Sequence, residues 1–284
     1  MTSIYKFKET INNVTKHENP IVFSNSELKK LKLNVIKQLN KVTLRKTGNP
    51  IKSVKIVNEI IKKHQLATAT SSVPKVAKVN DRYFWGLASP GFPSLASIKM
   101  NENEVNRFIP EAANTGLRSL LFAITKKCPL NCEHCFEWDN LNKKEDLPVS
   151  EIIEIIHKYQ DYGTTQMMLS GGEPMLRVND LYDVLQAAKP GTDFWIITSG
   201  LGLNKSRAKR LKDSGLTGVM VSLDHYDAKA HNEFRGFEGA FDWVTQAIAN
   251  ANEAGLVTTL SLCSTKSFTS EDNLRRYMEL AKKL

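Results

Sequence analysis

The chain has 284 residues, of which 41% are apolar and 24% charged, a balance that fits a folded globular protein and argues against wholesale disorder. No window approaches the roughly 18 consecutive apolar residues of a membrane span, and the N-terminus lacks the apolar core of a secretory signal, so we expect a cytoplasmic protein. The net charge of +9 is unevenly placed, because residues 1–115 hold 19 basic and 8 acidic side chains, whereas residues 116–284 hold 20 and 22. This imbalance predicts a basic extension over 1–115 and a core domain over 116–284.

Two helices that form a hairpin are predicted in the extension. The first follows Ser24-Asn25-Ser26-Glu27, which has the form of a capping box. The second follows Asn49-Pro50, a cap and a first-turn proline, and its spacing turns Val54, Val57 and Ile61 inward. The many lysines between the apolar positions can attract an anionic partner, whether nucleic acid, a membrane surface or an acidic peptide, or can form a solvated helical face.

From residue 119 the pattern changes to strand, loop and helix, repeated five times. Short apolar strands that alternate with amphipathic helices imply right-handed βαβ units and a parallel sheet. The sequence therefore predicts an α/β fold of five βα units with a mostly helical N-terminal extension. Polar residues follow the strands, where ligands bind in parallel α/β folds. The predicted strands cover residues 120–125, 167–170, 194–198, 218–223 and 257–262.

Three of the four cysteines lie directly after the first of these strands, in the spacing C-x3-C-x2-C. Cys128, Cys132 and Cys135 can converge on one inorganic centre, and three thiolates would leave one iron of a [4Fe-4S] cluster open to another ligand. A structural zinc site is an alternative that needs a fourth ligand, for which His134 is poorly placed and Cys263 is possible but lies at the far end of the fifth strand. Three unrelated buried cysteines are the remaining alternative.

A second motif, Leu169-Ser170-Gly171-Gly172-Glu173-Pro174, follows the second strand. Together with the cysteine motif it resembles the radical S-adenosylmethionine (AdoMet) superfamily over about residues 116–284. The segments 221–224 and 232–236 are similar to the fourth-strand region of members that act on peptides or make cofactors. The resemblance implies a partial (β/α) barrel, which in this family usually has six units. Only five are found here, which leaves open a truncated chain, a split gene product or a degenerate member.

The resemblance also implies roles for individual residues. Cys128, Cys132 and Cys135 would hold a [4Fe-4S] cluster whose open iron binds AdoMet. Glycines let the backbone approach a ligand closely, and a carboxylate can accept a hydrogen bond from an ammonium group. The motif residues that would line AdoMet are Gly171, Gly172, Glu173 and Pro174.

Further AdoMet contacts are implied by hydroxyl, ring and charged side chains. Thr198 or Ser199, and Ser222, sit where the family contacts the ribose or the carboxylate, and His134 would lie beside the adenine. Arg235 would pair with the AdoMet carboxylate or form a structural salt bridge. Asp224 would contact the ribose or cap the next helix.

The implied activity is reductive cleavage of AdoMet to methionine and a 5′-deoxyadenosyl radical, which abstracts hydrogen from an unknown substrate. That substrate is a peptide, a tRNA or a small molecule, and a reductant protein of the flavodoxin or ferredoxin type is expected. Two other functions remain open at this point. One is a [4Fe-4S]-binding scaffold or partner-binding subunit without catalysis, and the other is a structural zinc protein.

Overall fold

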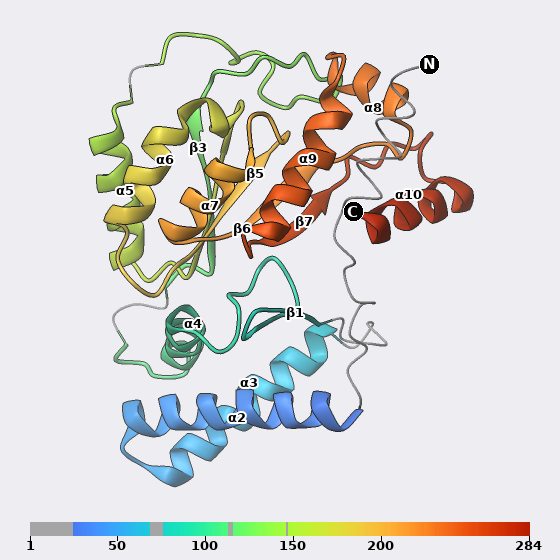
Figure 1. Ribbon diagram of the computed structural model, residues 1–284. Helices are drawn as coiled ribbons and strands as arrows, with labels where there is room; N and C mark the ends of the chain where they lie inside the picture. The colour runs from blue at the N-terminus through green and yellow to red at the C-terminus, as the bar shows by residue number, and fades with distance from the viewer. Residues whose placement is uncertain (1–24, 69–75, 113–115, 146) are drawn as a thin grey trace.

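A computed structural model describes residues 25–68, 76–112, 116–145 and 147–284 (Figure 1). The predicted capping residue Ser24 lies outside these ranges. Among the described residues, no helix combines the length and the hydropathy that crossing a membrane requires.

Five parallel strands form one sheet, and their order in the sheet follows their order in the chain. Each connection returns the chain to the end of the sheet where the strands begin, so that every strand runs in the same direction, as in successive right-handed βαβ units. The predicted α/β fold with five βα units is therefore confirmed. The strands are β3 (Ser119–Thr125), β4 (Gln166–Gly171), β5 (Asp193–Thr198), β6 (Leu216–Ser222) and β7 (Val257–Ser261).

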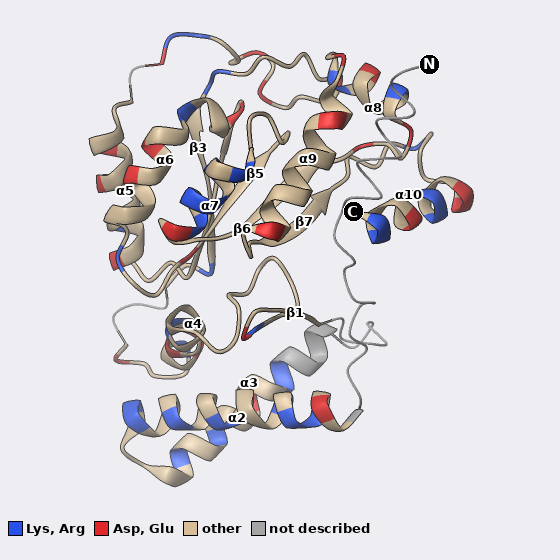
Figure 2. Cartoon of the chain, viewed as in Figure 1, with Lys and Arg blue, Asp and Glu red and all other residues tan. Residues whose placement is uncertain are grey.

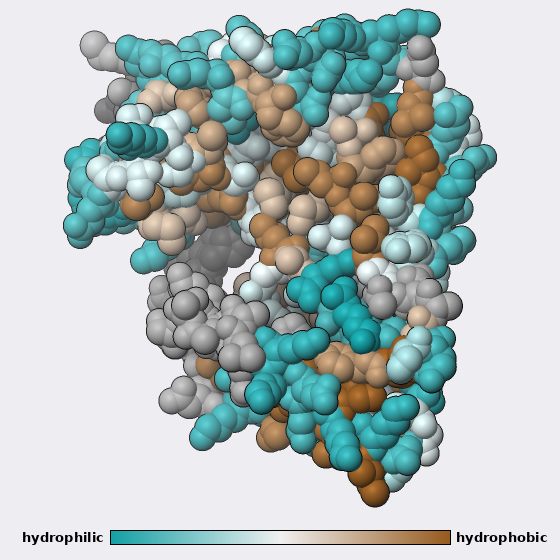
Figure 3. Space-filling view, turned by 180° about the vertical axis from the view of Figure 1, so that it is seen from behind, coloured by the Kyte–Doolittle hydropathy of each residue, from teal (hydrophilic) through white to brown (hydrophobic). Residues whose placement is uncertain are grey.

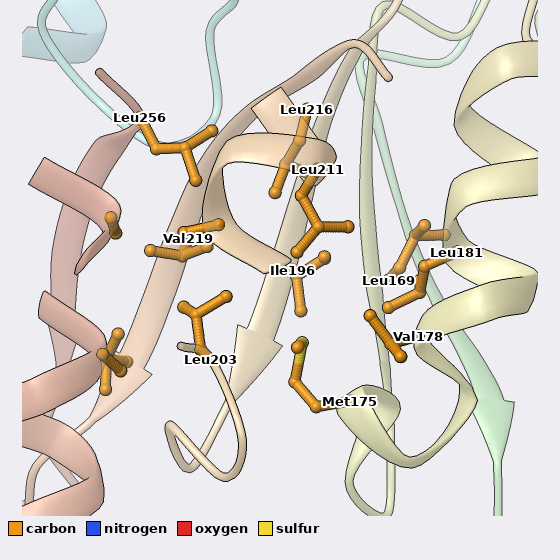
Figure 4. Close-up of a cluster of buried hydrophobic side chains, with 14 of the residues drawn as sticks. Leu169, Met175, Val178, Leu181, Ile196, Leu203, Leu211, Leu216, Val219 and Leu256 are labelled. Carbon is orange, nitrogen blue, oxygen red and sulfur yellow. The ribbon is translucent and has the colours of Figure 1, made fainter. Parts of the chain in front are cut away.

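Helices cover one face of this sheet (Figure 1). The core lies between the two layers, where Leu169, Ile196 and Val219 of neighbouring strands pack with Leu181 and Leu211 of the helices (Figure 4). All five of these side chains are fully buried. The helices are α5 (Val149–Asp161), α6 (Val178–Ala187), α7 (Lys205–Asp213) and α9 (Ala240–Glu253), with α10 (Glu271–Lys283) after β7.

The other face of the sheet is more open. Side chains alternate along a strand, so Met168, Ile197 and Met220 point away from the helices, and they are half-buried. Leu121 on the same face is 58% exposed. In the view from behind, apolar side chains gather over the middle of the molecule (Figure 3).

The N-terminal part has its own small core. The predicted hairpin is confirmed as α2 (Asn25–Thr47) and α3 (Pro50–Thr68), and Asn49 caps α3 by accepting a hydrogen bond from Lys52 N at 3.0 Å. α4 (Leu95–Asn106), which the sequence analysis did not predict, closes this core. The prediction that Val54 faces inward is wrong, because its side chain is 54% exposed. The core residues are Leu39, Val42, Ile56, Val57, Ile60 and Val105.

The N-terminal part sits against the ends of the strands where the chain enters the sheet. Lys99 Nζ and Asn103 Nδ2 of α4 donate hydrogen bonds to the carbonyls of Gln160 and Gly163, which precede β4, at 2.7 and 2.8 Å. Nearby, β1 (Ala77–Val79) and β2 (Arg82–Phe84) form a hairpin. Arg82 of this hairpin forms an ion pair with Asp193, the first residue of β5. These contacts place the basic extension opposite the end of the sheet where the polar motifs lie.

Candidate functional site

The three motif cysteines lie on the loop between β3 and α5, and all three are half-buried free thiols. Asn142 holds this loop in shape, since its side chain accepts a hydrogen bond from Cys128 N at 3.1 Å and donates one to Cys128 O at 3.0 Å. The loop also turns on itself where Cys135 N donates to Cys132 O at 3.2 Å. Burial raises the pKa of Cys128 to about 11, which favours the protonated thiol at neutral pH when no metal is bound.

A helix that the sequence analysis did not predict, α8 (Ala228–Arg235), packs its C-terminal end against the cysteine loop. Asn131 N donates to Arg235 O at 3.3 Å, and Glu133 N donates to Phe234 O at 3.1 Å. The chain leaves the helix through Gly236, whose φ is +62° and where an added Cβ would lie 2.5 Å from Asn131 O. Glycine is required there because the two segments are in contact.

Arg235 joins this helix to the site. Its guanidinium forms an ion pair with Asp224 at 2.5 Å, with the side chains only 10% and 2% exposed, and its Nη1 lies 3.7 Å from Cys132 Sγ. Burial raises the pKa of Cys132, and the Arg235 charge opposes that rise. The structural salt bridge is therefore present, whereas pairing of Arg235 with the AdoMet carboxylate stays a prediction. Asp224 does not cap α8, because Asp227 does so by accepting from Ala230 N at 3.0 Å.

Substitution of Arg235 by methionine is expected to lower the free energy of unfolding by about 3–5 kcal/mol, because it leaves the Asp224 carboxylate buried without its partner. Arg275→Met is the matched control, since Arg275 pairs with Asp272 and Glu279 on the exposed surface of α10, where ion pairs contribute little to stability. Urea unfolding of the cluster-free protein measures both. Equal losses in the two variants would show that the Arg235–Asp224 pair does not stabilise the fold.

The two motif glycines lie in close contact with the backbone that leads from β3 into the cysteine loop. Gly171 has φ +136°, and a Cβ there would lie 2.2 Å from Thr125 O. A Cβ on Gly172 would lie 2.3 Å from Lys127 O and 3.0 Å from the Cβ of Cys128. The backbone of this turn continues the sheet, with Gly172 N donating to Thr125 O at 2.8 Å. Any side chain at these positions would push the cysteine loop away.

Glu173 is buried at 1% exposure, and both of its carboxylate oxygens accept two hydrogen bonds. Oε1 accepts from Met175 N at 3.0 Å and from Thr198 Oγ1 at 2.7 Å. Oε2 accepts from the backbone N and the Oγ of Ser199, at 2.8 and 2.6 Å. A carboxylate has about four acceptor positions, so this one is saturated by the protein. Glu173, Thr198 and Ser199 thus tie the end of β4 to the end of β5, and their contact with AdoMet stays a prediction.

The remaining predicted residues lie at the same edge. Pro174 is buried and begins a short 3-10 helix, η1 (Pro174–Arg177), while Ser222 is the half-buried last residue of β6. His134 stacks on Phe234 of α8, with ring centroids 4.5 Å apart. Burial lowers the pKa of His134, which favours the neutral ring.

A network that sequence reasoning missed surrounds the end of β3. Arg177 donates to Ile124 O at 2.8 Å and to Leu147 O at 3.1 Å, while Glu145 accepts from Thr125 Oγ1 at 2.8 Å. These residues fix the path of the loop back to α5. A cavity of about 350 Å³, whose lining includes Thr125 and Glu145, opens beside the two glycines. This volume lies in the range of about 300–1,000 Å³ that is typical of small-molecule pockets.

His231 of α8 is buried and makes a hydrogen bond that depends on its being neutral. Its Nδ1 accepts a hydrogen bond from Asp224 N at 3.1 Å, which requires the neutral ring. Burial, together with the charge of Arg235, lowers the pKa of His231 to about 4. In the unfolded chain the pKa of this histidine is about 6.5. Between about pH 4 and pH 6.5 the unfolded chain therefore binds more protons than the folded chain.

The free energy of unfolding is therefore expected to fall as the pH drops from about 6.5 to about 4, by up to about 1.4 kcal/mol per pH unit from this residue. His231→Gln removes the titrating group, so its stability should depend less steeply on pH over the same window. Urea unfolding at several pH values tests this. Parallel profiles for the two proteins would contradict the assignment.

The side chains at this edge fit a [4Fe-4S] cluster and AdoMet. Soft thiolates are the ligands that iron–sulfur clusters prefer, and three of them lie on one loop. His134 Nδ1 and Arg235 Nε are buried beside that loop and have no hydrogen-bond partner among the described residues. Within the same residues, no three Cys, His, Asp or Glu side chains surround a single metal position. A cluster does not need such a group, because each thiolate binds a different iron.

The profile of the Radical SAM superfamily matches residues 122–278. The chain belongs to this superfamily, as the two motifs predicted, and the [4Fe-4S] cluster and AdoMet are the cofactors of the superfamily. The chain is also similar to two curated relatives and to one solved structure.

The chain is 36% identical over 149 residues to a probable GTP 3',8-cyclase of Methanococcus aeolicus, covering 50% of this chain and 48% of that protein. It is 34% identical over 143 residues to a PqqA peptide cyclase of Methylocella silvestris, covering 50% and 38%. The crystal structure of Streptococcus suis SuiB superposes with a TM-score of 0.51 at 18% identity, over 88% of this chain and 53% of that one. The structural likeness supports the fold. The chain spans about half or less of the length of these two curated relatives.

Proposed function

We propose that this chain binds a [4Fe-4S] cluster through Cys128, Cys132 and Cys135 and cleaves AdoMet to start hydrogen abstraction from a substrate. When bound and reduced, the cluster supplies the electron that breaks a carbon–sulfur bond of AdoMet, giving methionine and a 5′-deoxyadenosyl radical. The observation that carries the proposal is that the cysteine loop packs directly on the glycine turn, where Gly172 admits no side chain against Cys128.

In this proposal the residues of the chain bind AdoMet, orient it and shield it from solvent. The backbone of Gly171 and Gly172 would line the methionine part of AdoMet, and the neutral ring of His134 would lie beside the adenine. Ser222 offers a hydroxyl at the end of β6. Glu173 accepts hydrogen bonds from Thr198 and Ser199 and thereby holds the end of β5 in a fixed position relative to the end of β4.

The substrate belongs to one of two classes in this proposal, a peptide or a small molecule. One relative carries the name of a peptide cyclase and another the name of a GTP cyclase. A reductant of the flavodoxin or ferredoxin type supplies electrons, and a reducing cytoplasm keeps the thiols available. We also propose that the chain divides at residue 115, which is supported by the separate apolar core of the N-terminal helices.

The test is an electron paramagnetic resonance measurement on protein reconstituted with iron and sulfide without oxygen. Dithionite should give the signal of a reduced [4Fe-4S] cluster, and AdoMet should change that signal because it binds next to the open iron. A signal that AdoMet leaves unchanged would favour a cluster-binding scaffold over an AdoMet enzyme. Failure to bind iron at all would contradict both functions.

A further inference from the structure

We propose that the α2–α3 hairpin is a docking surface for an acidic, amphipathic peptide segment, bound at the end of the fold opposite the cysteine loop. The first support is charge. Residues 26–63 hold 11 basic and 2 acidic side chains, whereas the rest of the chain holds 28 of each. The whole net charge of the protein is thus on this hairpin (Figure 2). All 11 basic side chains are exposed.

The second support is a set of aliphatic side chains exposed among the lysines. Leu33, Leu44, Ile51 and Val54 are 57%, 46%, 70% and 54% exposed. On α2, Leu33, Lys37, Lys41 and Leu44 follow one another at helical spacing and form an outward row. On α3, Ile51 and Lys55 are spaced in the same way. Both rows face away from the buried stripes of their helices, so they do not contribute to the N-terminal core.

This surface matches a peptide better than other anionic partners. Residues 26–63 contain ten lysines, a single arginine and no aromatic residue. Single-stranded nucleic acids are bound by stacking on aromatic side chains, which this surface lacks, and contacts of lysine with phosphates alone would leave the four exposed aliphatic side chains without a partner. Helices that lie on membranes bury a broad apolar face of Trp, Phe or Leu, whereas the exposed aliphatic side chains here are separated by lysines. The carboxylates of an acidic segment would pair with the lysines, and leucine or isoleucine side chains of the same segment would cover the four exposed aliphatic residues.

The position of the hairpin limits how such a peptide is used. The N-terminal part attaches where the chain enters the sheet, and the cysteine loop follows the exit of β3. β3 has seven residues, so the two ends are separated by about 20 Å or more at about 3.3 Å per residue. A peptide held at the hairpin must therefore extend by at least about six residues to reach the site. This step rests on the proposed function, because it takes the captured peptide as the substrate.

Fluorescence anisotropy of a labelled peptide that repeats Glu-Leu-Glu-Glu tests the surface, using the full chain without a cluster. In the variant that combines Lys37→Glu, Lys41→Glu and Lys55→Glu, the affinity should fall by at least about tenfold. The matched control combines Lys266→Glu, Lys282→Glu and Lys283→Glu, which change the charge equally at exposed positions of the core, and should bind like the unaltered protein. Circular dichroism confirms that both variants are folded.

The double variant Leu33→Ser, Val54→Ser should weaken binding of this peptide but not of polyglutamate of the same length. The proposal is overturned if the peptide does not bind, if both triple variants lose affinity equally, or if single-stranded RNA or phosphatidylglycerol vesicles bind more tightly than the peptide. Because the assay needs neither cluster nor AdoMet, its failure is distinct from failure of the proposed function.

Discussion

Replacing Cys132 by alanine is expected to reduce the iron bound after reconstitution from about four atoms per chain to nearly none. Cys128→Ala and Cys135→Ala should do the same, because the remaining pair of thiolates cannot hold a cluster. Cys132 has the additional contact with Arg235, at 3.7 Å from its Sγ, so its loss also removes one of the contacts between the loop and α8. Iron and sulfide analysis with the visible absorption spectrum measures the effect.

Cys263→Ala is the control for this prediction. Cys263 is half-buried after the end of β7, and its backbone N, not its thiol, donates to Asp224 at 2.9 Å. Iron content should therefore stay near that of the unaltered protein. If Cys263→Ala lost the cluster while Cys132→Ala kept it, the ligand assignment would be wrong.

Glu173→Ala is expected to lower the free energy of unfolding by about 3 kcal/mol and to abolish AdoMet binding. The substitution leaves the backbone N–H groups of Met175 and Ser199 buried without an acceptor, at about 1–3 kcal/mol each. It also frees the Thr198 and Ser199 hydroxyls that the carboxylate holds. Glu173→Gln should be nearly as damaging, because its amide NH₂ would face donors.

Urea unfolding and equilibrium dialysis of AdoMet measure the two effects of the Glu173 substitutions. Glu154→Ala on the exposed side of α5 is the control and should change neither. Loss of AdoMet binding without loss of stability would instead indicate that the Glu173 carboxylate contacts the ligand directly.

The sheet could be predicted from the sequence because its strands are short apolar runs and its helices have a clear period. The three cysteines and the glycine turn were visible for a different reason, since their spacing is itself the signal. Helix α8 was missed because Ala228–Arg235 has a polar sequence, and its burial comes from contact with the cysteine loop. The residues that α8 buries, His231, Asn232 and Arg235, follow helical spacing but are polar, so no apolar stripe marks the helix in the sequence.

The side-chain networks were beyond sequence reasoning. The sequence allowed Arg235 two roles, and only the structure revealed Asp224 beside it. Glu173 was predicted to face the ligand, and the structure surrounds its carboxylate with donors from β5. Val54 was misplaced because the buried side of α3 is centred on Ile56, Val57 and Ile60, and Val54 lies outside that stripe and faces solvent.

The central claim is that this chain cleaves AdoMet, and the most direct measurement is chromatographic detection of 5′-deoxyadenosine. Protein reconstituted without oxygen is mixed with dithionite and AdoMet, and the Cys132→Ala variant is treated in parallel. We predict 5′-deoxyadenosine with the unaltered protein and none with the variant. A fully loaded cluster that produces no 5′-deoxyadenosine, or equal amounts from both proteins, would contradict the claim.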